Sequence, residues 1–247
     1  MKSDPISRDK LVEHSPKWTH RGRRFTQADV AGYEIEGRRL VVKDFRPRPC
    51  LVRRWWGRWI LRREWERLER LQGLAGIPRL LGWVDEDAFA MEWIEADRLP
   101  LRKDGSLEPA YFDRLAALVE AMHARGVSHG DLRRKNVLVD AGQRPYLIDF
   151  ATAALAGSGR HKGRLFERLC EVDRLTVLKL RVYYCPGSLT EVQQRQLAEQ
   201  PVALRVGRFL RKKVYRPLKP RQLRRRWARW RACLFGAGDE GDENDEA

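Results

Sequence analysis

Hydrophobic and polar positions follow two different periods along the chain. In the first part, short apolar runs bounded by turn residues favour β-strands. These runs cover residues 30–35, 39–45, 80–84 and 88–94. The run Leu40-Val41-Val42, directly before Lys43, is almost continuously apolar, which is typical of a buried strand. The pattern therefore predicts a β-rich region before residue 95.

Helical spacing of apolar residues interrupts this region once and dominates the chain beyond it. A helix is predicted over residues 56–74, and two more over 111–125 and 167–184. Between the second and third helices, a polar loop at 128–136 leads into short strands at 137–139 and 146–150. Strands gathered in one part and helices in the next predict a two-lobed α+β protein, with a small strand-rich N-lobe and a helical C-lobe.

Changes in composition divide the chain into five segments. A polar, proline-containing leader is expected to be flexible, and two lobes, a basic amphipathic segment and an acidic tail come after it. Their predicted bounds are 1–16 for the leader, 17–96 for the N-lobe, 97–204 for the C-lobe, 205–238 for the basic segment and 239–247 for the tail. We see no internal repeat.

Composition limits the class of protein. With 43% hydrophobic residues in 247, the chain can bury a core, which excludes a wholly disordered protein. No apolar run approaches the roughly 18 residues of a membrane-spanning helix, and the first ten residues lack an apolar signal region. The four cysteines are far apart and lack metal-ligand spacing, which fits a reducing cytoplasm.

Charge points to an anionic partner. The formal net charge is +16, although six of the last nine residues are acidic. The body of the protein is therefore more cationic than the whole. Nucleic acid, a phosphorylated ligand and an anionic membrane surface are the candidate partner classes.

Three oxygen-bearing side chains make up the candidate chemistry. Asp131 and Asn136 share one tight loop between a helix and a strand. Asp149 ends a strand that can pair with the strand after Asn136, which would bring all three side chains into one pocket. Hard oxygen ligands suit Mg²⁺, which keeps waters and bridges substrate phosphates. A carboxylate beside them can orient a hydroxyl and take its proton.

The run His129-Gly130-Asp131-Leu132 with Asn136, followed by Asp149-Phe150-Ala151, resembles the catalytic loop and metal motif of the protein-kinase-like superfamily. The resemblance covers about residues 17–184. It implies that Asp131 is the catalytic base and that Asn136 and Asp149 hold Mg²⁺. It also implies further ATP-binding groups: Lys43 on the phosphates, Glu64 as its ion-pair partner, and the backbones of Glu92 and Ile94 at the adenine.

Simpler interpretations stay open for two of these residues. Lys43 could be a solvated strand lysine, although the apolar run before it favours burial. Glu66 and Glu69 lie on the same predicted helix as Glu64, which we favour because of its place in the apolar pattern. His129 is expected to be a structural loop residue that hydrogen-bonds backbone.

The chain also departs from the superfamily's pattern. No GxGxxG precedes Lys43, so the phosphate-covering loop must be short or irregular. Gly130 stands where many regulated protein kinases have arginine, so we expect no activation-loop phosphorylation through that residue. No APE motif follows Phe150. The peptide-binding apparatus of eukaryotic-type kinases is therefore expected to be reduced or absent.

Within the superfamily, the pattern VVKDF, RREW, GIPR, HGDLRRKN and LIDF resembles bacterial lipopolysaccharide core kinases most closely. That resemblance implies an ATP-dependent kinase that phosphorylates a sugar hydroxyl of the lipopolysaccharide core, on a heptose or 3-deoxy-manno-octulosonic acid. It would act at the cytoplasmic face of the inner membrane of a Gram-negative bacterium. The alternatives are a RIO-like serine/threonine protein kinase and a catalytically inactive kinase-fold membrane scaffold.

Two stretches combine arginine with tryptophan, at residues 46–63 and 205–231. In the second, Trp227 and Trp230 lie on one face of a predicted helix. Such a helix is typical of binding at an anionic membrane surface. The alternatives are packing against the C-lobe and binding of single-stranded nucleic acid. Interrupting prolines and the lack of a known nucleic-acid motif disfavour the latter.

Overall fold

The computed structural model describes residues 6–101, 105–157 and 160–198. The chain divides into two compact units, residues 1–197 and 198–247, and every element below belongs to the first apart from the last residue of one helix. The predicted helix around Trp227 and Trp230 and the acidic tail lie outside the described residues. None of the helices in the described part of the chain has the length and apolar character needed to cross a bilayer.

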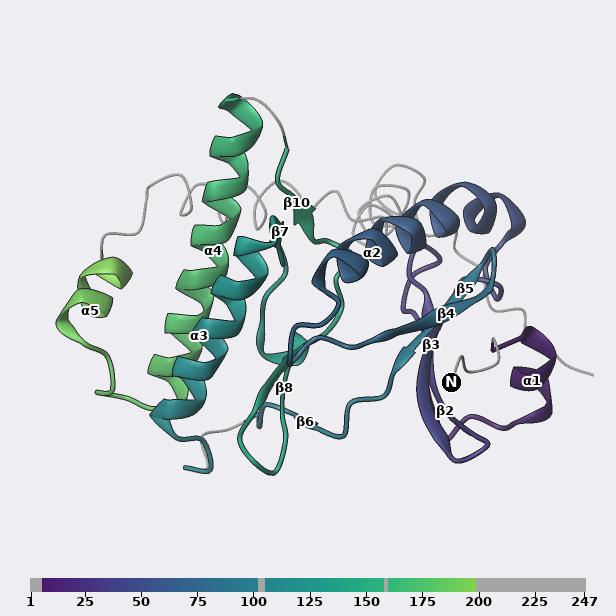
Figure 1. Ribbon diagram of the computed structural model, residues 1–247, viewed down its shortest axis with the longest axis horizontal. Coiled ribbons are helices and arrows are strands. Elements are labelled where there is room, and N and C mark those ends of the chain that lie inside the picture. Colours follow the sequence, from purple (N-terminus) through teal and green to yellow (C-terminus); the bar gives the residue numbers. More distant parts are fainter. Residues whose placement is uncertain (1–5, 102–104, 158–159, 199–247) are drawn as a thin grey trace, which may run out of the picture. The chain divides into compact units, whose positions relative to one another are not determined.

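A five-stranded antiparallel sheet forms the N-lobe, in the order β1-β2-β3-β5-β4. Strands β2 to β5 are labelled in Figure 1. Its strands are β1 (Trp18–His20), β2 (Asp29–Ile35), β3 (Arg38–Asp44), β4 (Leu80–Asp85) and β5 (Ala88–Glu92). Four of them match the predicted strands to within two residues. Val41 of β3 packs toward the main core, whereas Leu40 and Val42 join a smaller core on the other side. Successive side chains of β3 therefore point to opposite faces of the sheet, each of which packs against its own core.

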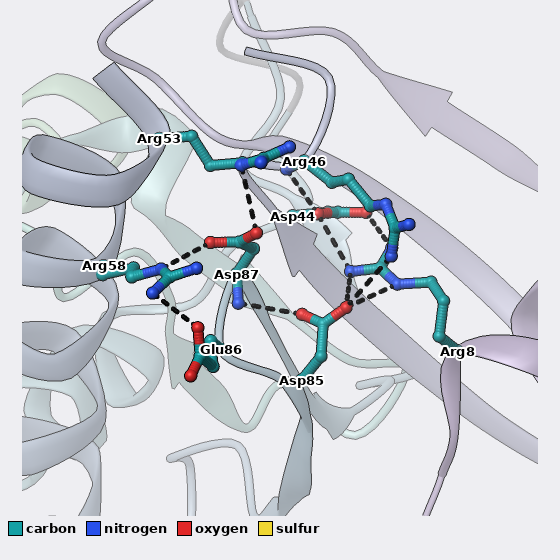
Figure 2. Close-up of polar contacts among 8 residues, drawn as sticks. All are labelled: Arg8, Asp44, Arg46, Arg53, Arg58, Asp85, Glu86 and Asp87. Carbon is teal, nitrogen blue, oxygen red and sulfur yellow. Dashed lines mark hydrogen bonds and ion pairs between the residues drawn. The ribbon is translucent and has the colours of Figure 1, made fainter. Parts of the chain in front are cut away.

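Part of the predicted flexible leader is a short helix, α1 (Arg8–Glu13), packed on the smaller core. Leu11 is buried there, and Arg8 pairs with Asp44 of β3 and with Asp85, which is 2.7 Å away (Figure 2). The prediction of a loose leader was therefore wrong for these residues. One apolar side chain and one arginine anchor a segment whose composition gives little sign of order.

The predicted helix over 56–74 begins earlier and in a different form. A π-helix, η1 (Val52–Gly57), runs directly into α2 (Arg58–Leu71). Gly57 lies where the two meet, and a Cβ there would come within 2.7 Å of the Phe45 ring. Absence of a side chain at Gly57 thus lets the helix pass close to the end of β3.

Two long helices, α3 (Pro109–Ala124) and α4 (Arg160–Tyr184), lie side by side in the C-lobe (Figure 1). The final described helix is α5 (Glu191–Ala198). Short strands complete the lobe: β6 (Asp97–Arg98), β8 (Val137–Val139) and β9 (Pro145–Leu147) form one sheet, and β7 (Val127–Ser128) pairs with β10 (Ala154–Leu155). The architecture is the predicted two-lobed α+β fold.

Strand β9 ends earlier than the predicted strand at 146–150. Asp149 has a φ of 71°, in the left-handed region, so the chain leaves the strand just before it. This turn carries the carboxylate away from the strand direction. Hydrogen bonding between the Ile148 N–H and the Asn136 carbonyl, 3.0 Å, still ties this segment to the loop before β8.

Candidate active site

Lys43 and Glu64 form a buried ion pair between strand β3 and helix α2. Lys43 is 7% exposed and Glu64 is 2% exposed. Strand alternation points Lys43 to the same face of the sheet as Val41, and the buried stripe of α2 that holds Leu61 and Leu68 presents Glu64 to that face. Neither Lys43 nor Glu64 is the solvated surface charge that the simpler interpretations would make it. Glu66, by contrast, has a side chain that is 51% exposed.

Asp149 joins this pair from the C-lobe. Its Oδ1 lies 3.4 Å from the Lys43 Nζ, and the backbone N–H of Phe150 donates to the Glu64 Oε1 at 3.1 Å. Burial lowers the pKa of Lys43, but Glu64 and Asp149 together outweigh it and raise that pKa to about 12. Burial raises the pKa of Asp149, yet Lys43 outweighs this and the pKa is lowered overall. Both Lys43 and Asp149 are therefore charged at neutral pH.

The loop between β7 and β8 holds Asp131 and Asn136 in a fixed relationship. The side-chain amide of Asn136 donates to the Asp131 carbonyl at 2.9 Å, and the short 3-10 helix η2 (Arg134–Asn136) closes the loop. The Asp131 carboxylate pairs with Arg133 at 2.7 Å. Because the Asn136 amide nitrogen is used by the loop backbone, its oxygen is the side-chain atom that could serve as a metal ligand.

Asp173 on α4 anchors this loop, although its sequence context gave no sign of it. Its carboxylate accepts from the backbone N–H groups of His129, at 2.7 Å, and Gly130, at 3.3 Å. It also lies 3.2 Å from the His123 Nε2. Asp173 is fully buried. A buried carboxylate with several donors orders the backbone immediately before Asp131.

His129 is a structural residue, as predicted. It is fully buried, its Nε2 lies 3.1 Å from the Ile148 carbonyl, and its ring packs against the Phe150 ring at 4.9 Å between centroids. An acceptor at Ile148 requires the proton on Nε2, which leaves Nδ1 without a partner. Burial lowers the pKa of His129, outweighing the nearby Asp173.

The end of β5 and the segment after it contain the two backbone positions predicted to bind adenine. The Glu92 N–H donates to the Arg79 carbonyl at 2.8 Å, so this N–H is not available to a ligand and the carbonyl is the candidate group. At Ile94 the carbonyl accepts from the Ala96 N–H at 3.0 Å, which leaves its own N–H as the candidate donor. A cavity of about 610 Å³ adjoins this segment and is lined in part by Trp93, Ile94 and Val139.

Two tryptophans, Trp18 of β1 and Trp93 between Glu92 and Ile94, lie against the sheet next to these backbone positions. Sequence reasoning assigned neither of them a role. Trp18 is paired in register with Gly32, which pairs with Val41. Residues directly opposite in neighbouring strands point to the same face, so Trp18 lies on the Lys43 side of the sheet. A Cβ on Gly32 would come within 2.5 Å of both the Trp18 ring and the Trp93 ring. The glycine therefore lets both indoles lie close to the strand, 5.5 Å apart between centroids.

An arginine-containing loop replaces the missing glycine-rich loop. Residues 21–28 connect β1 to β2 and contain Arg21, Arg23 and Arg24, all exposed. At its start, the Gly22 N–H donates to the Asp29 carboxylate at 2.8 Å. This is the short, irregular loop expected from the lack of a GxGxxG motif.

The donor set fits Mg²⁺ bound together with nucleotide phosphates. Asp149 offers a carboxylate whose side chain is 40% exposed, and Asn136 offers an amide oxygen. Among the residues that the structure describes, no group of three or more His, Cys, Asp or Glu could hold a metal by itself. Mg²⁺ in phosphoryl-transfer sites needs only one or two protein oxygens, because phosphates and water complete its octahedron.

Comparison with known proteins agrees with this geometry. The family model described as RIO domain matches residues 40–172, more than half of the chain. Among solved structures, the Rio2 kinase from Chaetomium thermophilum, in an ADP/Mg²⁺-phosphoaspartate complex, matches with a TM-score of 0.50 and 15% identity over 88% of this chain and 70% of that one. At that identity the match concerns the fold.

Curated relatives match over shorter stretches. A probable bifunctional tRNA threonylcarbamoyladenosine biosynthesis protein of Methanosarcina mazei is 35% identical over 123 residues, 48% of this chain and 21% of that protein. CBL-interacting protein kinase 15 of Oryza sativa subsp. japonica is 35% identical over 83 residues, 31% of this chain and 19% of that kinase. The matches thus span about a fifth of each relative.

Proposed function

The chain belongs to the RIO domain family, and from that premise we propose that it is an ATP- and Mg²⁺-dependent kinase that phosphorylates serine or threonine hydroxyls of a protein. The protein acceptor is proposed from the family match, and one observation carries the phosphotransfer itself. Lys43 contacts Glu64 and Asp149 together, and Glu64 holds the backbone of Phe150. Phosphoryl transfer depends on positioning and charge neutralisation, and this arrangement supplies both.

The roles of the residues follow from their places. Lys43 orients the ATP phosphates, while Asn136 and Asp149 would hold Mg²⁺, which neutralises charge on the phosphates when bound. Asp131 accepts the proton of the acceptor hydroxyl. The bond between the γ-phosphorus and the bridging oxygen of ADP breaks as the bond to the acceptor oxygen forms. The carbonyl of Glu92 and the N–H of Ile94 hold the base.

A sugar hydroxyl of the lipopolysaccharide core is the second candidate acceptor, and one observation favours it. Only residues 151–159 separate Phe150 from α4, and two of them, Ala154 and Leu155, pair with β7. This leaves little chain for a peptide-binding platform. Such a kinase would work at the cytoplasmic face of the inner membrane. The basic segment 205–238, predicted to bind that membrane, lies outside the described residues.

The two acceptors and the inactive scaffold can be separated in one assay. The full chain would be incubated with γ-labelled ATP and Mg²⁺, with a soluble protein extract in one arm and isolated core lipopolysaccharide in the other. Asp131→Ala and Asp149→Ala are the inactive controls. Labelling of protein that is lost in Asp131→Ala supports the proposal. Labelling of the lipopolysaccharide core alone supports the second candidate. If neither arm takes label, and both variants leave the cellular phenotype of the wild type, the scaffold is correct.

A further inference from the structure

Three tryptophans on the first turns of the α2 region are exposed to solvent. Trp55 and Trp56 belong to η1, and Trp59 belongs to α2; they are 79%, 43% and 45% exposed. Trp65 and Trp83, in contrast, pack against each other and against Phe89 in the core. A cluster of indoles exposed to solvent is unusual on a protein surface and indicates an interaction site.

The segment that carries these indoles contains basic side chains and no acidic ones. Residues 46–63 contain seven arginines and no acid. Four of these arginines are paired with acids of the N-lobe sheet. Arg46 lies 3.6 Å from Asp85, and Arg48 pairs with Asp29. Arg58 pairs with Glu86 at 2.5 Å and with Asp87 at 2.9 Å, and Arg53 lies 3.2 Å from Asp87 (Figure 2). These pairs fix the helix to the sheet.

Other arginines remain available beside the indoles. Arg54 and Arg62 are exposed, and neither pairs with an acidic side chain in the described part of the chain. Arg63 lies over the Trp59 ring, 4.5 Å from its centroid. The α2 face that carries Trp59 and Arg62 is distinct from the buried stripe that carries Leu61, Glu64 and Leu68. A partner can therefore approach without touching the ion pair at Lys43.

The loop between β1 and β2 extends the same surface. The Trp56 Nε1 donates to the Thr26 carbonyl at 3.1 Å, which ties the loop to η1. Phe25 of this loop is 57% exposed, and Arg23 and Arg24 lie just before it. Residues 17–28 also contain no acid.

We propose that this basic-aromatic face, made of Trp55, Trp56, Trp59, Phe25, Arg54 and Arg62, docks the protein on an anionic membrane surface. Indoles settle at the headgroup boundary, where they bury apolar area and keep their polar edge wet, while arginines meet lipid phosphates. A nucleic acid fits less well, because Trp56 and Trp59 already contact each other with centroids 5.2 Å apart and planes tilted by 41°. They offer no stacked series of platforms for bases.

The test uses the full chain and sedimentation with vesicles of phosphatidylcholine alone or with phosphatidylglycerol added. Binding is expected only to the anionic vesicles, is expected to weaken with salt, and should shift tryptophan fluorescence to shorter wavelength. Arg54→Glu and Arg62→Glu should each lower binding several-fold. Arg195→Glu, which makes the same charge change on the remote and exposed α5, should not. Trp55→Ala with Trp59→Ala should also lower binding, whereas Leu165→Ala, at an exposed position of α4, should not.

Two results would overturn the proposal. One is vesicle binding that survives all the changes in this face but is lost on Trp227→Ala with Trp230→Ala, which would assign docking to the basic C-terminal segment instead. The other is tight binding of single-stranded RNA that needs Trp55 and Trp59, without any binding to anionic vesicles. Circular dichroism of each variant separates loss of binding from loss of fold. The outcome is independent of the phosphate acceptor.

Discussion

Glu64 accepts a hydrogen bond from the backbone of Phe150 at 3.1 Å, through the same carboxylate oxygen that pairs with Lys43. One oxygen therefore joins β3, α2 and the segment after β9. Arg67, one turn further along α2, donates to the Ala153 carbonyl at 3.1 Å and strengthens the same connection. Displacement of α2 would break the Lys43 pair and release the backbone next to Asp149 together.

The shared Glu64 oxygen should be needed for efficient phosphotransfer. Glu64→Gln removes the charge that holds Lys43, so phosphotransfer should fall by about 100-fold, in the range seen when one electrostatic group is lost from an active site. Glu66→Gln is the matched control, because Glu66 lies on the same helix with an exposed side chain. It should leave steady-state kinetics close to wild type. Equal losses in the two variants would mean that α2 as a whole, and not the buried pair, limits activity.

Local patterns and the family resemblance together pointed to the residues of this candidate site. The apolar run before Lys43 and the spacing from Asp131 to Asn136 each depend on neighbouring residues, and the structure brings Lys43, Glu64 and Asp149 together. Asp173 and Trp18 could not be found in this way. Asp173 acts through backbone groups more than 40 positions away, and Trp18 depends on strand register and on the space left by Gly32. Only the folded chain reveals such relationships.

Asp173 should influence catalysis without touching substrate. Asp173→Asn keeps the size of the side chain but removes the charge that holds the His129 and Gly130 N–H groups. We expect a loss of about 1–3 kcal/mol in the free energy of unfolding. We also expect kcat to fall at least tenfold while KM for ATP changes little, because Lys43 stays in place. Glu171→Gln, on the same helix, is the control, and a loss confined to stability would contradict a positioning role.

Both the backbone conformation at position 130 and the close approach of Thr152 require a glycine there. Its φ is 72°, and a Cβ there would lie 2.8 Å from the Thr152 carbonyl oxygen. Gly37 has nearly the same φ, 73°, with nothing within 4 Å of the added atom. Gly37→Ala should thus cost only the left-handed strain, about 1–2 kcal/mol. Gly130→Ala should cost more in chemical denaturation, and equal costs would show that the contact with Thr152 relaxes freely.

Trp18 should contribute to nucleotide affinity. Its ring lies on the Lys43 face of the sheet, against Trp93 of the segment predicted to hold adenine. Stacking of a base on an aromatic ring is worth about 1–3 kcal/mol by alanine substitution. Trp18→Ala should therefore raise KM for ATP by roughly tenfold with a smaller change in kcat. Trp55→Ala removes a more exposed indole as the control, and an unchanged KM in Trp18→Ala would place the base elsewhere.

His129 should make folding stability depend on pH. Burial lowers its pKa below the usual value of about 6.5. The unfolded chain then binds a proton at a pH where the folded chain does not, so stability is fully present above pH 6.5 and is lost as pH falls toward the lower, folded pKa. Charging the ring would add a proton at Nδ1, which is buried without a partner. The loss is bounded at about 1.4 kcal/mol per pH unit in this window.

Urea unfolding of the wild type and of His129→Gln at pH 8 and pH 5.5 measures this effect. Glutamine retains an amide donor for the Ile148 carbonyl but takes up no proton, so its free energy of unfolding should fall less between the two pH values. Ser128→Ala is the control for general damage to the loop, because Ser128 is a buried, non-titrating neighbour. That variant should keep the wild-type slope. A slope that stays the same in His129→Gln would assign the pH dependence to other groups and show that the buried ring does not charge in this range.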